Sequence, residues 1–230
     1  LPCNHLLYTL LDFPIVRILG NAEWAIRLPA FAAGILLPVL IYRAGRKWFG
    51  RNAGLLGACL MLTNPVFVHF SVNGRAYTLH ACLVLVLWLA ATRLAERPSW
   101  PSWLTLVLSG AAGLMALPTM AYPLAGTYLW LLAMYGTARG EIGGRRWRHV
   151  RNLCVCGAAT IWLGALAYLP AYVASDQWYS LDGAEVAAAL PWGMLPLRLT
   201  QFIKGAFWLW NTNLPAPVVW TQFAFAAVGV

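Results

Sequence analysis

A short polar link between two apolar runs carries the residues best suited to chemistry. The link spans residues 71–77 and contains Asn73, Arg75 and Tyr77, with Arg75 at the point where the chain re-enters an apolar run. The planar guanidinium of an arginine matches phosphate oxygens, and the Tyr77 hydroxyl offers a further donor. This pattern suggests an anion site. An arginine whose side chain reaches from a membrane edge to water gives the same pattern, so both interpretations stay open. His80, on the face of Tyr77, is expected to be a packed polar residue.

A second polar group is predicted on one face of a helix over residues 5–19. His5, Tyr8 and Asp12 are three and four residues apart, which places them on a common face. Leucines and isoleucines recur every four residues on another face. Because Asp12 and Pro14 disfavour a membrane crossing, the pattern favours an amphipathic helix in the membrane interface. We expect its polar face, Asp12 included, to be solvated.

Other candidate residues carry weaker signals. Cys154 and Cys156 form a lone C-x-C pair, so we expect no metal site and no cofactor. Acidic and aromatic residues lie together late in the chain, in a pattern that suits carbohydrate contact but is also ordinary in an exposed loop: Asp176, Trp178, Tyr179, Asp182 and Glu185.

The composition shows whether the surroundings of these residues are water or lipid. Of 230 residues, 61% are hydrophobic and 10% charged, and the mean hydropathy is +0.66. Soluble domains have about 45–50% apolar and about 25% charged residues. These values exclude a soluble domain, a nucleic-acid-binding module and a disordered tail. They predict an integral membrane protein.

The apolar runs predict an all-α, polytopic transmembrane bundle with six to seven crossings. Pro118 divides one long apolar stretch into two crossings. The six predicted crossings cover residues 26–44, 52–70, 76–94, 101–117, 119–137 and 152–173.

The basic residues predict the orientation. Loops 43–51, 93–97 and 138–151 hold 11 of the 16 lysines and arginines, and the order of crossings places all three on one side. Since basic loops mark the cytoplasmic side, residues 1–25, 71–75 and 174–214 should lie outside.

The chain is expected to be one transmembrane domain and a fragment at both ends, because it begins with Leu1 and stops inside an apolar run. In this division residues 1–25 are an outer interfacial segment and 26–173 the six crossings. Residues 174–214 are an outer loop with an interfacial helix, and 215–230 begin a truncated helix.

Four segments in order resemble one family. Residues 4–8, 20–30, 45–55 and 71–77 are similar to motifs of bacterial glycosyltransferases related to protein O-mannosyltransferases and lipid A aminoarabinose transferase. The family's motifs are His-Pro-Pro-Leu-Tyr, G-x-s-E-x-A-x-R-L-P, G-R-x-x-F-G-x-x-x-G-L and S-Q-x-x-R-x-Y. Leu6 and Leu7 replace the two prolines of the first motif, and the last motif has no acid at Asn73. The resemblance covers about residues 1–95.

This resemblance implies an inverting, GT-C-type glycosyltransferase in the bacterial plasma membrane. It would transfer a sugar from a polyprenyl-phosphate donor to an acceptor at the outer face, among membrane lipids. We expect no nucleic-acid partner and no cofactor. The family's catalytic Asp would precede residue 1. By the same resemblance Arg75 and Tyr77 would bind the donor phosphate, and His5, Tyr8 and Asn73 would line the cleft. A non-catalytic subunit that binds polyprenyl phosphate and a lipid flippase or transporter are the alternatives.

Overall fold

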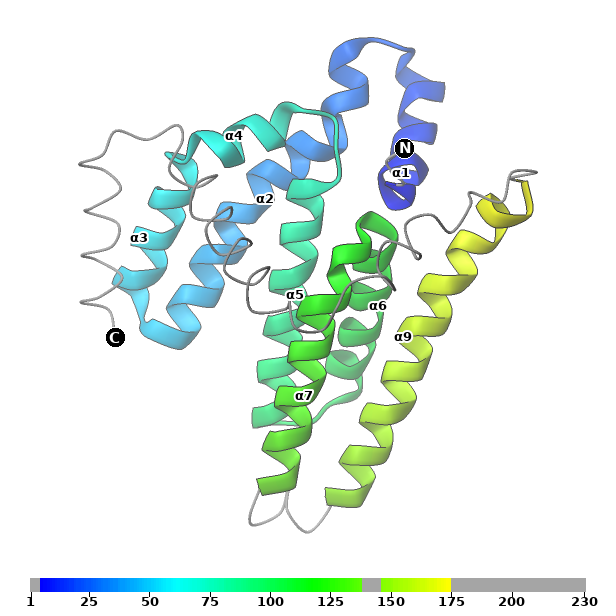
Figure 1. The fold of residues 1–230 in the computed structure, drawn as a ribbon. Coiled ribbons are helices and arrows are strands. Elements are labelled where there is room, and N and C mark those ends of the chain that lie inside the picture. The colour runs from blue at the N-terminus through cyan, green and yellow to red at the C-terminus, as the bar shows by residue number, and fades with distance from the viewer. Residues whose placement is uncertain (1–4, 138–145, 175–230) are drawn as a thin grey trace, which may run out of the picture. The chain divides into compact units, whose positions relative to one another are not determined.

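The computed structural model describes residues 5–137 and 146–174, and within these ranges the chain is helical without strands (Figure 1). The all-α prediction is confirmed. The elements are α1 (Leu6–Leu19), α2 (Glu23–Phe49), α3 (Arg51–Leu62), α4 (Pro65–Val72), α5 (Tyr77–Glu96), α6 (Trp100–Ala116), the 3-10 turn η1 (Pro118–Met120), α7 (Ala121–Thr137) and α9 (Arg146–Ala174).

Three of these helices are long and apolar enough to cross a membrane: α2, α5 and α9. The bent pair of α3 and α4 makes a fourth if it is one span. With 17 residues each, α6 and α7 are shorter than the roughly 20 that a crossing needs. The membrane bundle is thus confirmed, whereas the count of six crossings stays a prediction. The expected helices within 174–214 and 215–230 lie outside the described residues.

The apolar run 52–70 is not the single helix that its hydropathy suggests. It divides into α3 and α4, which meet at an angle of 64°. Pro65 has no N–H to continue the ladder of α3, and it begins α4 instead. The Asn64 side chain caps α4 by accepting a hydrogen bond of 3.0 Å from the backbone N–H of Val66. The bend carries the chain into the link.

The stretch 101–137 contains two helices, as predicted. Extended backbone at Leu117, followed by η1, separates α6 from α7. Between them and α5 lies the largest buried cluster, which includes Leu87, Leu106 and Leu131. This cluster holds the three helices together.

Glycines set the tight turn between α2 and α3. Gly50 has φ +94°, a left-handed conformation that favours glycine. A Cβ on Gly45 would lie 2.7 Å from the Cα of Gly54, so no larger residue fits where the two helices part. The spacing of these glycines in the segment 45–55 therefore has a packing reason.

The basic segments meet at one end of the bundle. Lys47 at the end of α2 forms an ion pair of 3.1 Å with Glu96 at the end of α5. Tyr135 of α7 donates a hydrogen bond of 3.1 Å to the carbonyl of Leu94 and stacks on His149 of α9. We call this the basic end, defined by residues 43–51, 93–97 and 146–151. The grouping of these segments agrees with the predicted topology.

Candidate functional site

The opposite end of the bundle holds the sequence-predicted site residues. Here α1 packs on the start of α2 and the end of α6. The Tyr8 hydroxyl donates a 2.6 Å hydrogen bond to the carbonyl of Ile26, and Nδ1 of His5 lies 3.3 Å from the carbonyl oxygen of Ala116. We call this the link end, since the segment 73–76 closes it.

Small residues allow this close packing. Tyr8 is buried in a cluster with Ala30, Ala76 and Ala116, all three alanines being fully buried. Gly74, with φ +60°, makes the turn of the link and lies 3.8 Å from the Tyr8 hydroxyl, measured from a Cβ built on the glycine. The link is therefore held directly against α1.

Aromatic rings fix Tyr77 beneath the link. The His5 ring meets the Tyr77 ring edge to face, with centroids 5.6 Å apart, and the Phe70 ring lies 4.7 Å away on another side. The amide nitrogen of Asn73 lies 3.4 Å from Nε2 of His69 on the same turn. The structure thus brings His5, Tyr8, Asn73 and Tyr77 into one region.

Arg75 differs from the other arginines at this end. Arg27 forms an ion pair with Glu23, and the Arg17 guanidinium lies over the ring of Phe13 at 4.9 Å. The Arg75 side chain is exposed, and no hydrogen bond or ion pair engages it within residues 5–137 and 146–174. Among the described residues, no acid neutralises its charge.

The polar face of α1 is solvated only in part, since Thr9 is exposed and Asp12 is half-buried. Tyr8 is only 5% exposed, whereas Leu10 and Ile18 on the apolar stripe are more than half exposed. The polar face turns toward the bundle and the apolar stripe turns away from it. In lipid this arrangement is favourable, because hydrocarbon receives leucines as well as a protein core does.

Some polar atoms of this face are buried without a hydrogen-bond partner in the described residues. They are Oδ1 of Asp12 and Nε2 of His5. Burial raises the pKa of the Asp12 carboxyl above its ordinary value of 3.8. Burial also raises the pKa of Tyr8, and the charge of Asp12 adds to that increase. Asp12 is therefore a stronger base than a solvated carboxylate.

His80 lies one turn below Tyr77 on α5 and is half-buried. Its Nδ1 is buried, and the imidazole lies against the backbone of Gly113 on α6. It packs inside the bundle as expected and does not reach the exposed surface of the link.

An apolar groove leads to the link. It has a volume of about 390 Å³ and lies between α2 and the bent pair α3–α4, with Phe31, Ile35 and Phe67 in its lining. Its lining includes Ser71 and Val72, the first two residues of the link. We call it the link groove.

Metal binding has no support within residues 5–137 and 146–174, where no three His, Cys, Asp or Glu side chains come together. Cys154 and Cys156 are both free thiols. The acidic and aromatic candidates of residues 176–185 lie outside the described residues.

The protein is an integral membrane protein of the all-α class. Its helical bundle contains apolar spans, and α1 turns its apolar stripe away from that bundle. The family model of dolichyl-phosphate-mannose-protein mannosyltransferase matches residues 14–168, well over half of the chain, and the chain belongs to that family. The resemblance noted in the sequence is thereby confirmed, and it extends past residue 95. Family membership points to a membrane glycosyltransferase of the GT-C type, and the family in general uses a polyprenyl-phosphate-linked sugar donor. No curated protein and no solved structure matches the chain.

Sequence reasoning found the residues of the link end but missed two features of it. The sequence did not predict that the polar face of α1 turns inward, because an amphipathic pattern does not say which face meets lipid. The link groove was missed because its lining comes from three helices. The bend that shapes it carried a readable signal, the Asn64-Pro65 pair.

Proposed function

We propose that the protein transfers a sugar from a polyprenyl-phosphate donor at the link end, with the donor phosphate bound by Arg75. The observation that carries the proposal is an exposed arginine, unpaired within the described residues, that follows Val72 of an apolar groove by three residues in the chain. A prenyl phosphate needs both features, one for its chain and one for its charge.

The prenyl chain and the phosphate of the donor would bind at neighbouring positions along α4. The prenyl chain occupies the link groove, where apolar contact contributes roughly 25 cal/mol for each Å² removed from solvent. The phosphate then lies at the link, beside the Arg75 fork and the Tyr77 hydroxyl. Tyr77 is positioned for this by the rings of His5 and Phe70.

Arg75 would contribute to the rate as well as to binding. The acceptor oxygen attacks the anomeric carbon, the bond from that carbon to the phosphate oxygen breaks, and the phosphate gains negative charge. A cation aimed at this developing charge stabilises the transition state more than the ground state. In this proposal the acceptor proton passes to an Asp that would precede residue 1, as the family resemblance implies, and attack from the opposite side inverts the anomeric carbon.

The membrane orientation follows from the charges. The basic end would face the cytoplasm and the link end the outer side of a bacterial plasma membrane. His5, Tyr8 and Asn73 would then line an outer cleft beside the donor sugar.

The test measures sugar transfer from a polyprenyl-phosphate sugar by the full-length protein in membranes. Arg75→Ala should lower the rate by about 100-fold or more, the usual loss when one group that stabilises developing negative charge is removed. Arg75→Lys should recover part of it. The control is Arg17→Ala, which removes the same charge from α1 at the same end.

Unchanged transfer by Arg75→Ala, at equal protein abundance, would remove Arg75 from the site. Binding of the polyprenyl phosphate by the wild-type protein without any transfer would instead favour a non-catalytic subunit. Movement of the carrier across the membrane without transfer would favour a flippase.

A further inference from the structure

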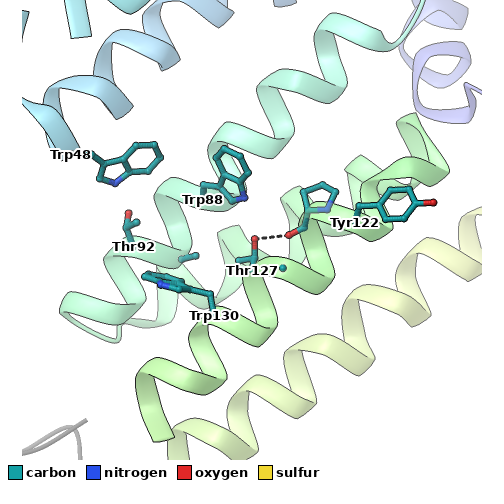
Figure 2. Close-up of a pocket in the computed structure, with 9 residues that line it drawn as sticks. Trp48, Trp88, Thr92, Tyr122, Thr127 and Trp130 are labelled. Carbon is teal, nitrogen blue, oxygen red and sulfur yellow. Dashed lines mark hydrogen bonds between the residues drawn. The ribbon is translucent and has the colours of Figure 1, made fainter. Parts of the chain in front are cut away.

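A second groove lies toward the basic end of the bundle. It has a volume of about 420 Å³, within the range of sites for small molecules. Figure 2 shows three indoles around it, Trp48 from α2, Trp88 from α5 and Trp130 from α7, with Tyr122 farther along α7. We call it the tryptophan groove.

The groove is apolar along its length and cationic at one end. The hydroxyl of Thr127 is satisfied, because it donates a 2.6 Å hydrogen bond to the carbonyl of Pro123 (Figure 2). At the other end Nζ of Lys47 lies 3.2 Å from Oγ1 of the lining residue Thr92 and 3.1 Å from a carboxylate oxygen of Glu96. Such a groove fits an amphiphile with an apolar chain and an anionic head.

Lys47 can accept a further ligand. An ammonium group has three donors, and Thr92 and Glu96 take two of them. Glu96 is the one acid among the residues of the segments 43–51 and 93–97, which hold six cations. The surroundings of Lys47 thus carry a net positive charge that attracts an anion and repels a second cation.

We propose that the tryptophan groove binds an acyl chain of an anionic phospholipid whose phosphate pairs with Lys47. Indole rings suit this place, since tryptophan favours the boundary between hydrocarbon and headgroups. Basic pockets between helices on the positively charged side of a membrane protein are suited to anionic headgroups. A zwitterionic lipid would bring the same chain but also a cation, which the basic end disfavours. This site is separate from Arg75 and does not rest on the proposed transfer reaction.

A substitution that fills the tryptophan groove with a side chain tests the proposal. A Cβ on Gly126 meets nothing within 4 Å, so Gly126→Leu places its side chain in open space inside the groove without a clash. Gly136→Leu is the matched control, because Gly136 lies on the same helix, has equally open space and is outside the groove.

The full-length protein, purified in detergent, is titrated with phosphatidylglycerol or phosphatidylcholine, and bound lipid is counted by native mass spectrometry. We expect the wild type and Gly136→Leu to retain one phosphatidylglycerol at least tenfold more strongly than phosphatidylcholine. Gly126→Leu should lose this retention. Equal retention of the two lipids by the wild type, or full retention by Gly126→Leu, would overturn the proposal.

The cation is tested separately. Lys47→Ala should abolish the preference for phosphatidylglycerol, and Lys47→Arg should keep it. Arg46→Ala, which removes a charge about 100° around the same helix, should leave the preference in place. Loss of the preference in Arg46→Ala alone would overturn the assignment to Lys47. Displacement of phosphatidylglycerol by an equal concentration of polyprenyl phosphate would assign the groove to that carrier instead.

Discussion

The two grooves share an arrangement, and they differ in whether the nearby cation is paired with an acid. Each lies against α2 and contains an apolar chain-sized space near a cation. At the link end that cation, Arg75, is exposed and unengaged by the described residues, whereas at the basic end Lys47 is already paired with Glu96. A cation without a partner can respond fully to charge that appears during a reaction. A cation held by a carboxylate is better suited to a ligand that stays bound.

The largest expected difference comes from removing one cation at each end. Arg75→Glu should lower transfer by more than the roughly 100-fold expected for Arg75→Ala, because it places like charge beside the phosphate. Arg46→Ala, an exposed cation of the basic end outside the tryptophan groove, should keep transfer within about twofold. Initial rates at saturating donor measure both. A similar loss in the two variants would show that net charge, rather than the position of Arg75, governs the rate.

Packing between α2 and α3 should give the next largest effect. A Cβ on Gly54 would lie 2.6 Å from the carbonyl oxygen of Tyr42 and 2.7 Å from the backbone nitrogen of Arg46, and neither backbone atom can rotate away. Gly54→Ala should destabilise the protein by about 1–3 kcal/mol, as overpacking does. Thermal unfolding in detergent measures this.

Gly57→Ala is the control for that packing. It lies on the same helix, and its new methyl would meet only the end of the Ile41 side chain at 3.2 Å. An equal loss of stability in both variants would mean that helix α3 itself, rather than its contact with α2, is being disturbed.

A change in the shape of the link groove should alter donor binding more than it alters the stability of the protein. A Cβ on Gly34 would meet Cβ and Oγ of Ser71 at 2.6 Å, so Gly34→Ala must displace α4 from α2. We expect a several-fold rise in KM for the donor with a smaller change in kcat, because chain binding contributes to ground and transition states alike. Gly136→Ala, in open space on α7, should change neither. An unaltered KM in Gly34→Ala would argue against the link groove as the site of the prenyl chain.

The smallest effect concerns the buried polar face of α1. Because the pKa of Asp12 is raised in the folded protein, the protonated form is favoured on folding. Its contribution to stability is therefore present at low pH and is lost as the pH rises from the unfolded value of 3.8 through the folded value. Asp12→Asn should raise the melting temperature slightly at pH 7 and leave it unchanged at pH 3. A lower melting temperature at pH 7 would show that the Asp12 carboxylate has a stabilising partner.

Most helices were readable from hydropathy, and the exceptions have identifiable causes. The break before Pro65 was not predicted because α3 and α4 are both apolar, although a capping Asn and a proline mark it. The glycines at 45, 50 and 54 were visible as a motif, but their role in a close helix contact needs the distance between two backbones. The division between α6 and α7 was readable from Pro118, which begins the 3-10 turn between them.

The sequence by itself determined the membrane class, the helical composition, the segregation of basic loops and the family, because these depend on local composition and order along the chain. Tertiary structure alone decided which cations are engaged and where apolar space remains. Glu96 of α5 pairs with Lys47 of α2, while no acid among the described residues reaches Arg75. It also decided that α1 turns Tyr8 and Asp12 inward, since in lipid the apolar face of a helix gains as much by facing hydrocarbon as by facing protein.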